Sequence, residues 1–396
     1  MMKISSSSFE NTEMAFMSKS DWQLKKAYWL FKVVNNNTMA NVSTKLANLA
    51  LQMHLPVKGI IKKTVFEHFC GGESIEESQR TVNILSNYQV GAILDYSVEG
   101  KNNEAAFDAT LAETLKTIQN AKGNPKIPYC VFKPTGMGSA ELMEKIQLGI
   151  ELTALEKQQF EKMRNRYFAI GQAAFDNDIR LLIDAEDSWY QQTIDTLLYE
   201  MMEKFNKKRA IVFNTYQMYR WASLKNIKNA HAKGKEKGYI VGAKLVRGAY
   251  MENERVRAKE HGYEDPICFD KLATDKSYND GLKYCVEHIE EMELFNGSHN
   301  EYSNLYLTEL MKKQGLANDD KRIFFAQLFG MSDNISFILG NAGYNVAKYV
   351  PYGPVKHVMP YLIRRAEENT SVAGQSSREL NLLQKEMIRR KEKVKN

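Results

Sequence analysis

The chain has 396 residues, of which 43% are hydrophobic and 26% charged, an ordinary composition for a globular protein. Its net charge of +6 is too small to indicate nucleic acid as a partner. The four cysteines form no Cys-x-x-Cys pair and the seven histidines are mostly scattered, so neither a disulfide framework nor a metal site is expected.

Residues 1–88 are predicted to form a lead followed by a helical arm. The serines at 5–8, followed by Glu10 and Glu13, fit neither a secretory signal nor an arginine-rich transit peptide. We therefore expect roughly the first 20 residues to be a flexible lead. From Asp21 to Tyr88 the apolar residues recur at helical spacing, and no residue of this arm suggests chemistry.

From residue 89 the pattern changes to short apolar runs, most of them followed by a helical stretch. The runs are Gly91–Tyr96, Tyr129–Lys133, Arg180–Asp184, Ala210–Asn214, Ile240–Val246, Met292–Phe295, Ile323–Gln327 and Val346–Tyr349. The helices between them include Ala105–Ala121, Leu155–Asp176, Trp189–Phe205, Ser277–Ile289 and His357–Asn369. Alternating strands and helices predict a parallel sheet, and about eight such units favour an α/β protein with a (β/α)8 TIM-like barrel over residues 89–376.

An open, doubly wound sheet is the competing architecture. It is poorly supported, because Gly136-Met-Gly138 is followed by Glu141 where a dinucleotide-binding loop has its third glycine. No apolar run approaches the roughly 18 residues that a membrane-spanning helix needs.

Residues 377–396 are predicted to form a basic C-terminal helix or tail. Between Lys385 and Asn396, six basic residues outnumber two acidic ones. A solvated helix end is the simpler interpretation, and contact with anionic lipid is the alternative.

Polar residues gather at the predicted ends of the strands, where barrel enzymes carry their chemistry. They are Asp95, Lys133, Asp184, Asn214, Arg247, Tyr250, Ser298, His299, Gln327, Tyr349 and Tyr352. Each alone could be a helix cap or a member of a structural ion pair. Their convergence on one end of the sheet makes them a candidate site.

The last predicted helix carries the adjacent pair Arg364 and Arg365, with Glu368 one turn later. Two neighbouring guanidiniums repel each other unless an anion lies between them, and each can bind a carboxylate or phosphate through two hydrogen bonds. Glu368 is close enough in sequence to orient one of them.

Together these residues would form a box for a small zwitterionic amino acid. The arginines suit its carboxylate, Asp184 or the neighbouring Glu186 suits its ammonium, and tyrosines supply the walls. No nucleophile-and-base signature indicates hydrolysis. Lys133 and Lys244 could form a Schiff base or neutralise an anionic cofactor, although an ion pair is the simpler role for either.

Five segments resemble the proline dehydrogenases, flavoenzymes that oxidise L-proline to 1-pyrroline-5-carboxylate. They are Leu182–Glu186, Phe213–Gln217, Gly242–Arg255, Gly262–Pro266 and Tyr361–Asn369. The likeness extends from about Ile60 to Thr370 and looks closer to the monofunctional, eukaryotic-type branch than to the bifunctional bacterial enzymes. It implies a distorted (β/α)8 barrel that holds FAD and passes electrons to a quinone, with peripheral membrane contact as an option.

The resemblance also implies roles for individual residues. Asp184 would hold the substrate ammonium or accept its proton, and Lys244 would place a positive charge beside the flavin. Arg364 and Arg365 would bind the proline carboxylate, supported by Glu368. The other residues lining the proline site would be Lys133, Leu245, Tyr250, Leu328 and Tyr349. FAD would contact Ala185, Asn214, Val246, Arg247, Gly248, Ala249, Ser298 and His299.

Three positions bear on the detail of this resemblance. Many bacterial members have arginine where this chain has Lys244, and glutamine where it has Asn214. Hydroxyproline-oxidising relatives tend to carry a smaller residue at the position of Tyr349, so proline is the expected substrate.

A hydroxyproline dehydrogenase on the same scaffold is the nearest alternative. A Schiff-base lyase using Lys133 or Lys244 and a non-catalytic amino-acid-binding barrel are more distant ones. The expected location is the cytoplasm, with peripheral contact to the inner membrane as an option, or the mitochondrion if the source is eukaryotic.

Overall fold

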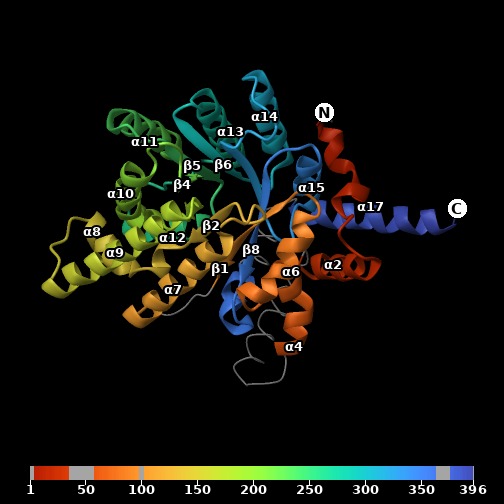
Figure 1. The fold of residues 1–396 in the computed structure, drawn as a ribbon, viewed down its shortest axis with the longest axis horizontal. Coiled ribbons are helices and arrows are strands. Elements are labelled where there is room, and N and C mark those ends of the chain that lie inside the picture. Colours follow the sequence, from red (N-terminus) through yellow and green to blue (C-terminus); the bar gives the residue numbers. More distant parts are fainter. Residues whose placement is uncertain (1–3, 35–57, 98–101, 363–374, 396) are drawn as a thin grey trace. The chain divides into compact units, whose positions relative to one another are not determined.

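The computed structural model describes residues 4–34, 58–97, 102–362 and 375–395 (Figure 1). The strands are β1 (Gly91–Tyr96), β2 (Tyr129–Phe132), β3 (Arg180–Ile183), β4 (Val212–Gln217), β5 (Val241–Val246), β6 (Met292–Gly297), β7 (Ile323–Leu328) and β8 (Val346–Tyr352). The α-helices are α1 (Thr12–Ala15), α2 (Asp21–Val34), α4 (Lys58–Ile61), α5 (Glu67–Phe69), α6 (Ile75–Ser86), α7 (Glu104–Ala121), α8 (Ala140–Gln147), α9 (Ala154–Asp176), α10 (Ser188–Phe205), α11 (Ser223–Lys237), α12 (Met251–His261), α13 (Lys271–Glu287), α14 (Glu301–Lys313), α15 (Asp333–Asn341) and α17 (Gln375–Lys395). Two 3-10 helices, η1 (Ser6–Glu10) and η3 (Pro134–Gly136), and a π-helical turn, η2 (Lys62–Phe66), complete the described elements.

The eight strands form one sheet in the order β1-β8-β7-β6-β5-β4-β3-β2, and their pairing is parallel. Consecutive strands from β2 to β8 are neighbours, and helices connect them. This is the strand order of a (β/α)8 TIM-like fold, so the predicted fold class is confirmed.

Side-chain hydrogen bonds explain where two elements differ from their predicted bounds. The strand expected at Ala210–Asn214 is β4, which begins at Val212, because Asn206 Oδ1 accepts the backbone N–H groups of Ile211 and Val212 at 2.9 Å each. Helix α13 begins six residues before the predicted Ser277, because Asp270 caps it by accepting the backbone N–H of Ala273 at 2.7 Å.

The chain divides into two compact units. Unit 1 contains residues 1–100 and 327–396, and unit 2 contains residues 101–326. The sequence-based boundaries at 88/89 and 376/377 differ from this division and stay a proposal.

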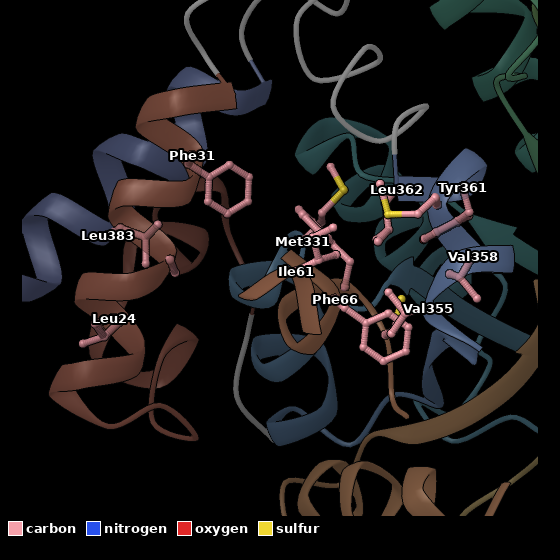
Figure 2. Close-up of a cluster of buried hydrophobic side chains, with 14 of the residues drawn as sticks. Leu24, Phe31, Ile61, Phe66, Met331, Val355, Val358, Tyr361, Leu362 and Leu383 are labelled. Carbon is pink, nitrogen blue, oxygen red and sulfur yellow. The ribbon is translucent and has the colours of Figure 1, made fainter. Parts of the chain in front are cut away.

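The core of unit 1 is a cluster of buried apolar side chains from the N-terminal arm and the C-terminal part of the chain (Figure 2). Helices α2 and α17 pack against each other, with Leu24 and Phe31 of α2 and Leu383 of α17 among the buried residues. The prediction of a flexible lead is wrong for the described part of that segment. Phe9 in η1 and Phe16 after α1 are both buried, because the lead folds into short helices that cover apolar surface.

Ion pairs also hold the C-terminal helix α17 to the N-terminal segment. Arg390 donates to Asp21 Oδ1 at 2.8 Å and to the backbone oxygens of Phe16 and Lys19 at 3.0 and 2.9 Å. It also pairs with Glu386, which is fully buried. The helix is therefore not simply a solvated end, and none of the described helices is long and apolar enough to cross a membrane.

Unit 2 has aromatic rings stacked edge-to-face near the starts of several strands. Tyr129 of β2 lies 5.5 Å from Phe213 of β4, 5.0 Å from Phe295 of β6 and 4.9 Å from Phe324 of β7, measured between ring centroids. The guanidinium of Arg180, at the first residue of β3, lies over the rings of Tyr129 and Phe324. We call the four rings of Tyr129, Phe213, Phe295 and Phe324 the aromatic plug.

Candidate functional site

The side chains of β4 alternate between two environments. Phe213 belongs to the aromatic plug, whereas its neighbour Asn214 donates a hydrogen bond to Asp195 of α10 at 2.9 Å. Because side chains alternate along a strand, Thr215 and Gln217 share the face of Phe213. We call this the inner face of the sheet, and the side that carries Asn214 the helix face.

A carboxylate between two ammonium groups is the centre of the site in unit 2. The strand register sets Lys244 of β5 opposite Thr215 of β4, so Lys244 lies on the inner face. Its Nζ lies 2.6 Å from Oδ1 of Asp184, which follows β3. Nζ of Lys133, which follows β2, lies 3.8 Å from Oδ2 of the same carboxylate. Lys133 and Asp184, which were predicted from the ends of two strands, therefore meet Lys244, for which the resemblance implies a place beside the flavin.

The electrostatics of this triad favour the ionised form of Asp184. Burial alone would raise the pKa of Asp184, but the charges of Lys244 and Lys133 and the hydrogen bond from Lys244 outweigh burial and lower it. The side chain of Lys244 is only 6% exposed, so removing its partner would leave a costly buried charge. Two ammonium groups against one carboxylate leave a positive excess, which suits an anionic group of a ligand.

A second carboxyl group, that of Glu186, lies two residues further on. It accepts hydrogen bonds from the backbone N–H of Thr135 at 2.8 Å and from Thr135 Oγ1 at 2.6 Å. Burial raises its pKa to about 7 although the Thr135 bonds oppose this shift. The side chain of Gln217, at the end of β4, donates to the backbone oxygen of Glu186 at 2.7 Å. Gln217 thus lies beside the end of β3, and sequence reasoning assigned it no role.

Arg247, after β5, is held by groups from α13 and from the segment after β6. Its Nη1 donates to Ser298 Oγ at 3.0 Å, so two residues predicted to contact FAD lie next to each other. Its Nε and Nη2 donate to Asp275 Oδ1 of α13 at 2.8 and 2.7 Å, and the guanidinium stacks on the ring of Tyr278. Sequence reasoning missed Asp275 and Tyr278, because only the folded chain brings α13 to the end of β5.

The two residues after Arg247 are exposed to solvent. Gly248 has a φ of +134°, which favours glycine, and a Cβ there would lie 1.4 Å from Cε1 of Tyr219. Gly248 and Ala249 are exposed, and Tyr250, the N-cap residue of α12, is half-buried. The other predicted cofactor contacts that end or follow a strand of unit 2 are Ala185, Val246, Ser298 and His299.

Two predicted residues, Asn214 and Leu245, point to the helix face instead of the inner face. Asn214 contacts α10 as described above, and Leu245 approaches α13, where a Cβ on Gly281 would lie 3.2 Å from its Cδ1. Successive side chains along a strand point to opposite faces, so both residues lie away from the inner face, and their predicted roles stay proposals. On β4 the residue with the expected amide on the inner face is Gln217.

The remaining predicted residues belong to unit 1. Tyr349 is buried on β8, and Leu328 ends β7 in a half-buried position. Arg364, Arg365 and Glu368 lie outside the described residues, so their predicted roles stay proposals.

Fold and site together define a (β/α)8 enzyme with a charged site at the strand ends. The sequence model of the proline dehydrogenase family matches residues 78–378, and this chain belongs to that family. The mitochondrial proline dehydrogenase 1 of Dictyostelium discoideum is 32% identical, over 96% of this chain and 74% of its own length. The hydroxyproline dehydrogenase of Xenopus laevis is 29% identical, over 95% of this chain and 88% of its own.

Among solved structures, proline utilization A from Bdellovibrio bacteriovorus, inactivated by N-propargylglycine, superposes with a TM-score of 0.72 at 19% identity. The match covers 91% of this chain and 38% of that chain. At this identity the likeness supports the fold alone.

Proposed function

We propose that this protein oxidises L-proline to 1-pyrroline-5-carboxylate, with FAD as the hydride acceptor and a quinone as the final electron acceptor. Family membership supports proline oxidation. The observation that carries the assignment of the site is the ion triad of Lys133, Asp184 and Lys244, in which residues that follow β2 and β3 meet a residue on the inner face of β5.

The donors at the ends of β4, β5 and β6 fit an anionic flavin cofactor. Lys244 and Arg247 supply positive charge, Gln217 supplies an amide, and Ser298 supplies a hydroxyl. The backbone of Gly248 and Ala249 is exposed after β5, where a ligand could reach it. Bound FAD would supply the hydride acceptor.

The residues of this chain would bind and orient proline. Arg364 and Arg365 would hold its carboxylate, and Tyr349 would pack against its ring. Asp184 has a lowered pKa and is therefore a poor proton acceptor at neutral pH. We assign it to charge placement, where it fixes the position of Lys244 and attracts the substrate ammonium.

The alternatives are less well supported. A Schiff-base lyase needs a lysine amine that is free to attack a carbonyl, but the Nζ atoms of Lys133 and Lys244 both face the carboxylate of Asp184, at 3.8 and 2.6 Å. Hydroxyproline remains the nearest alternative substrate, and the bulk of Tyr349 on β8 favours proline.

The mitochondrial name of the Dictyostelium relative supports a mitochondrial location if the source is eukaryotic. If the source is not eukaryotic, we propose a cytoplasmic location with peripheral contact to the inner membrane. That contact would place the enzyme beside a membrane quinone.

The decisive experiment is a visible absorbance spectrum of the purified protein before and after anaerobic L-proline. Flavin bands that bleach with proline are the expected result. Bands that persist with proline but bleach with hydroxyproline would shift the assignment to the alternative substrate. A colourless protein that takes up no flavin on reconstitution would contradict the proposal, and borohydride trapping of substrate would point to the lyase.

A further inference from the structure

Two histidines and a glutamate lie together in unit 2, at the opposite end of the strands from the candidate site. His231 lies in α11, His288 follows α13, and Glu291 directly precedes β6. Their ligand atoms all lie within 4.8 Å of one another. His231 is buried, and the other two are half-buried, so the cluster can be reached by a small ion from solvent.

The contacts of His231 orient its imidazole toward this cluster. Its Nδ1 lies 2.8 Å from the hydroxyl oxygen of Tyr284, and its Nε2 lies 2.7 Å from Oε2 of Glu291. The contact with Tyr284 resembles that of an outer partner which orients a metal-binding imidazole, and it leaves Nε2 facing the carboxylate of Glu291.

The other two groups are placed by local backbone structure. The backbone N–H of Glu291 donates to the backbone oxygen of His288 at 2.9 Å, which closes a turn and brings both side chains to one side. The His288 ring lies 4.6 Å from the His231 ring, measured between centroids. Within the part of the chain that the structure describes, no hydrogen bond of a His288 ring nitrogen is recorded.

We propose that His231, His288 and Glu291 bind a divalent transition-metal ion, for which Zn²⁺ is the best fit. Two imidazoles and one carboxylate are typical zinc ligands, and water would complete a tetrahedral shell. Nζ of Lys235 lies 3.1 Å from Oε1 of Glu291, and the other carboxylate oxygen, Oε2, faces the histidines. A structural ion-pair network is the alternative interpretation of the same contacts.

This inference is independent of the proposed oxidation. His231 and Glu291 are 60 positions apart, so spacing in the sequence does not reveal the site. A metal here would cross-link α11 to the turn before β6. This is the N-terminal end of the strands, where residues of barrel proteins contribute to stability and the active site is absent. We therefore expect bound zinc to stabilise the fold and to leave proline turnover unchanged.

The test is zinc binding by isothermal titration calorimetry on the full chain with its flavin, after removal of metals by chelation. We expect the wild-type protein to bind one Zn²⁺ more than His288→Gln or Glu291→Gln, and to unfold at a higher temperature when zinc is present. His288→Gln is the first choice, because it leaves the His231–Tyr284 contact intact. Tyr284→Phe should weaken binding by about tenfold as a positioning effect.

His261→Asn is the matched control, since His261 is an exposed histidine of α12 outside the cluster, and it should bind zinc as the wild type does. Equal stoichiometry and affinity in the wild type, His288→Gln and Glu291→Gln would overturn the proposal, as would a wild-type protein that binds no zinc. An inactive protein that still shows the zinc difference would contradict the proposed oxidation alone.

Discussion

The ammonium of Lys244 lies 2.6 Å from the Oδ1 atom of Asp184, and this contact joins the inner face of β5 to the end of β3. The two residues are 60 positions apart, and the pair is shielded from water on the lysine side. Lys244 therefore helps to keep Asp184 ionised, and the pair forms a fixed dipole at the centre of the site.

Replacing Lys244 by methionine should remove a buried positive charge and keep the volume of the side chain. We expect kcat/KM for proline to fall about 100-fold or more, because a preorganised charge at the reacting centre is lost. The measurement is steady-state turnover together with the flavin content of the purified variant. Lys276→Met is the control, since Lys276 is 77% exposed on α13, and a Lys244→Met enzyme as active as this control would refute the role.

Two substitutions on β4 distinguish its two faces. Gln217→Ala should reduce flavin content or turnover, because Gln217 ends the inner face beside Glu186. Asn214→Ala should lower the free energy of unfolding by about 1–3 kcal/mol, since Asp195 loses a buried hydrogen-bond donor, and should leave turnover near wild type. Denaturant titration and turnover of both variants provide the comparison. The reverse pattern would mean that the faces are wrongly assigned.

The buried carboxyl of Glu379 on α17 should make stability depend on pH. Burial raises its pKa from 4.5 to about 7. Between these values the folded state binds more protons than the unfolded state, so the free energy of unfolding falls as pH rises through this window and levels off above it. The free energy of unfolding should fall by about 3 kcal/mol across this window, because one pKa unit corresponds to about 1.4 kcal/mol.

Urea titrations from pH 4.5 to pH 8 measure this dependence. Glu379→Gln should remove this contribution to the pH dependence, because an amide does not titrate. The variant should still fold, since the amide oxygen can accept the backbone N–H of Ser332. An unchanged slope in the variant would show that another group titrates instead.

Arg390→Ala should loosen the contact between α17 and the N-terminal segment. The variant loses hydrogen bonds to Asp21 and to two backbone oxygens, and Glu386 keeps only Arg389 as an ionic partner among the described residues. We expect the free energy of unfolding to fall by about 1–3 kcal/mol in denaturant titrations. Lys391→Ala, at an exposed position next to it, should change stability by less than about 0.5 kcal/mol. Equal effects of the two would indicate that the ion pairs add nothing.

The fold could be predicted because hydrophobic periodicity depends only on local sequence. The alternation of short apolar runs with helical stretches identified all eight strands of the sheet, and the rule for parallel barrels placed Lys133 and Asp184 at one end of it. The place of Lys244 beside the flavin was implied by the resemblance instead. The start of β4 was misplaced because the side chain of Asn206, outside the strand, occupies the preceding backbone groups.

The faces of the strands and the helix partners could not be predicted in the same way. Leu245 was assigned to the substrate although it points to α13, because the resemblance gave its position but not the direction of its side chain. Alternation counted from Phe213 would have favoured Gln217 over Asn214. Asp275 carries no signal of its own, since its contact with Arg247 exists only after α13 packs on β5.

The aromatic plug limits how small molecules can enter and leave the inner face of the sheet in unit 2. Tyr129, Phe213 and Phe295 are all fully buried, and their rings fill the space near the strand starts on the inner face that leads to Lys244. A molecule that reaches Lys244 must therefore enter from the strand ends, and it must leave by the same opening. Substrate, product and electron acceptor would have to take turns, so each should hinder the others in steady-state kinetics.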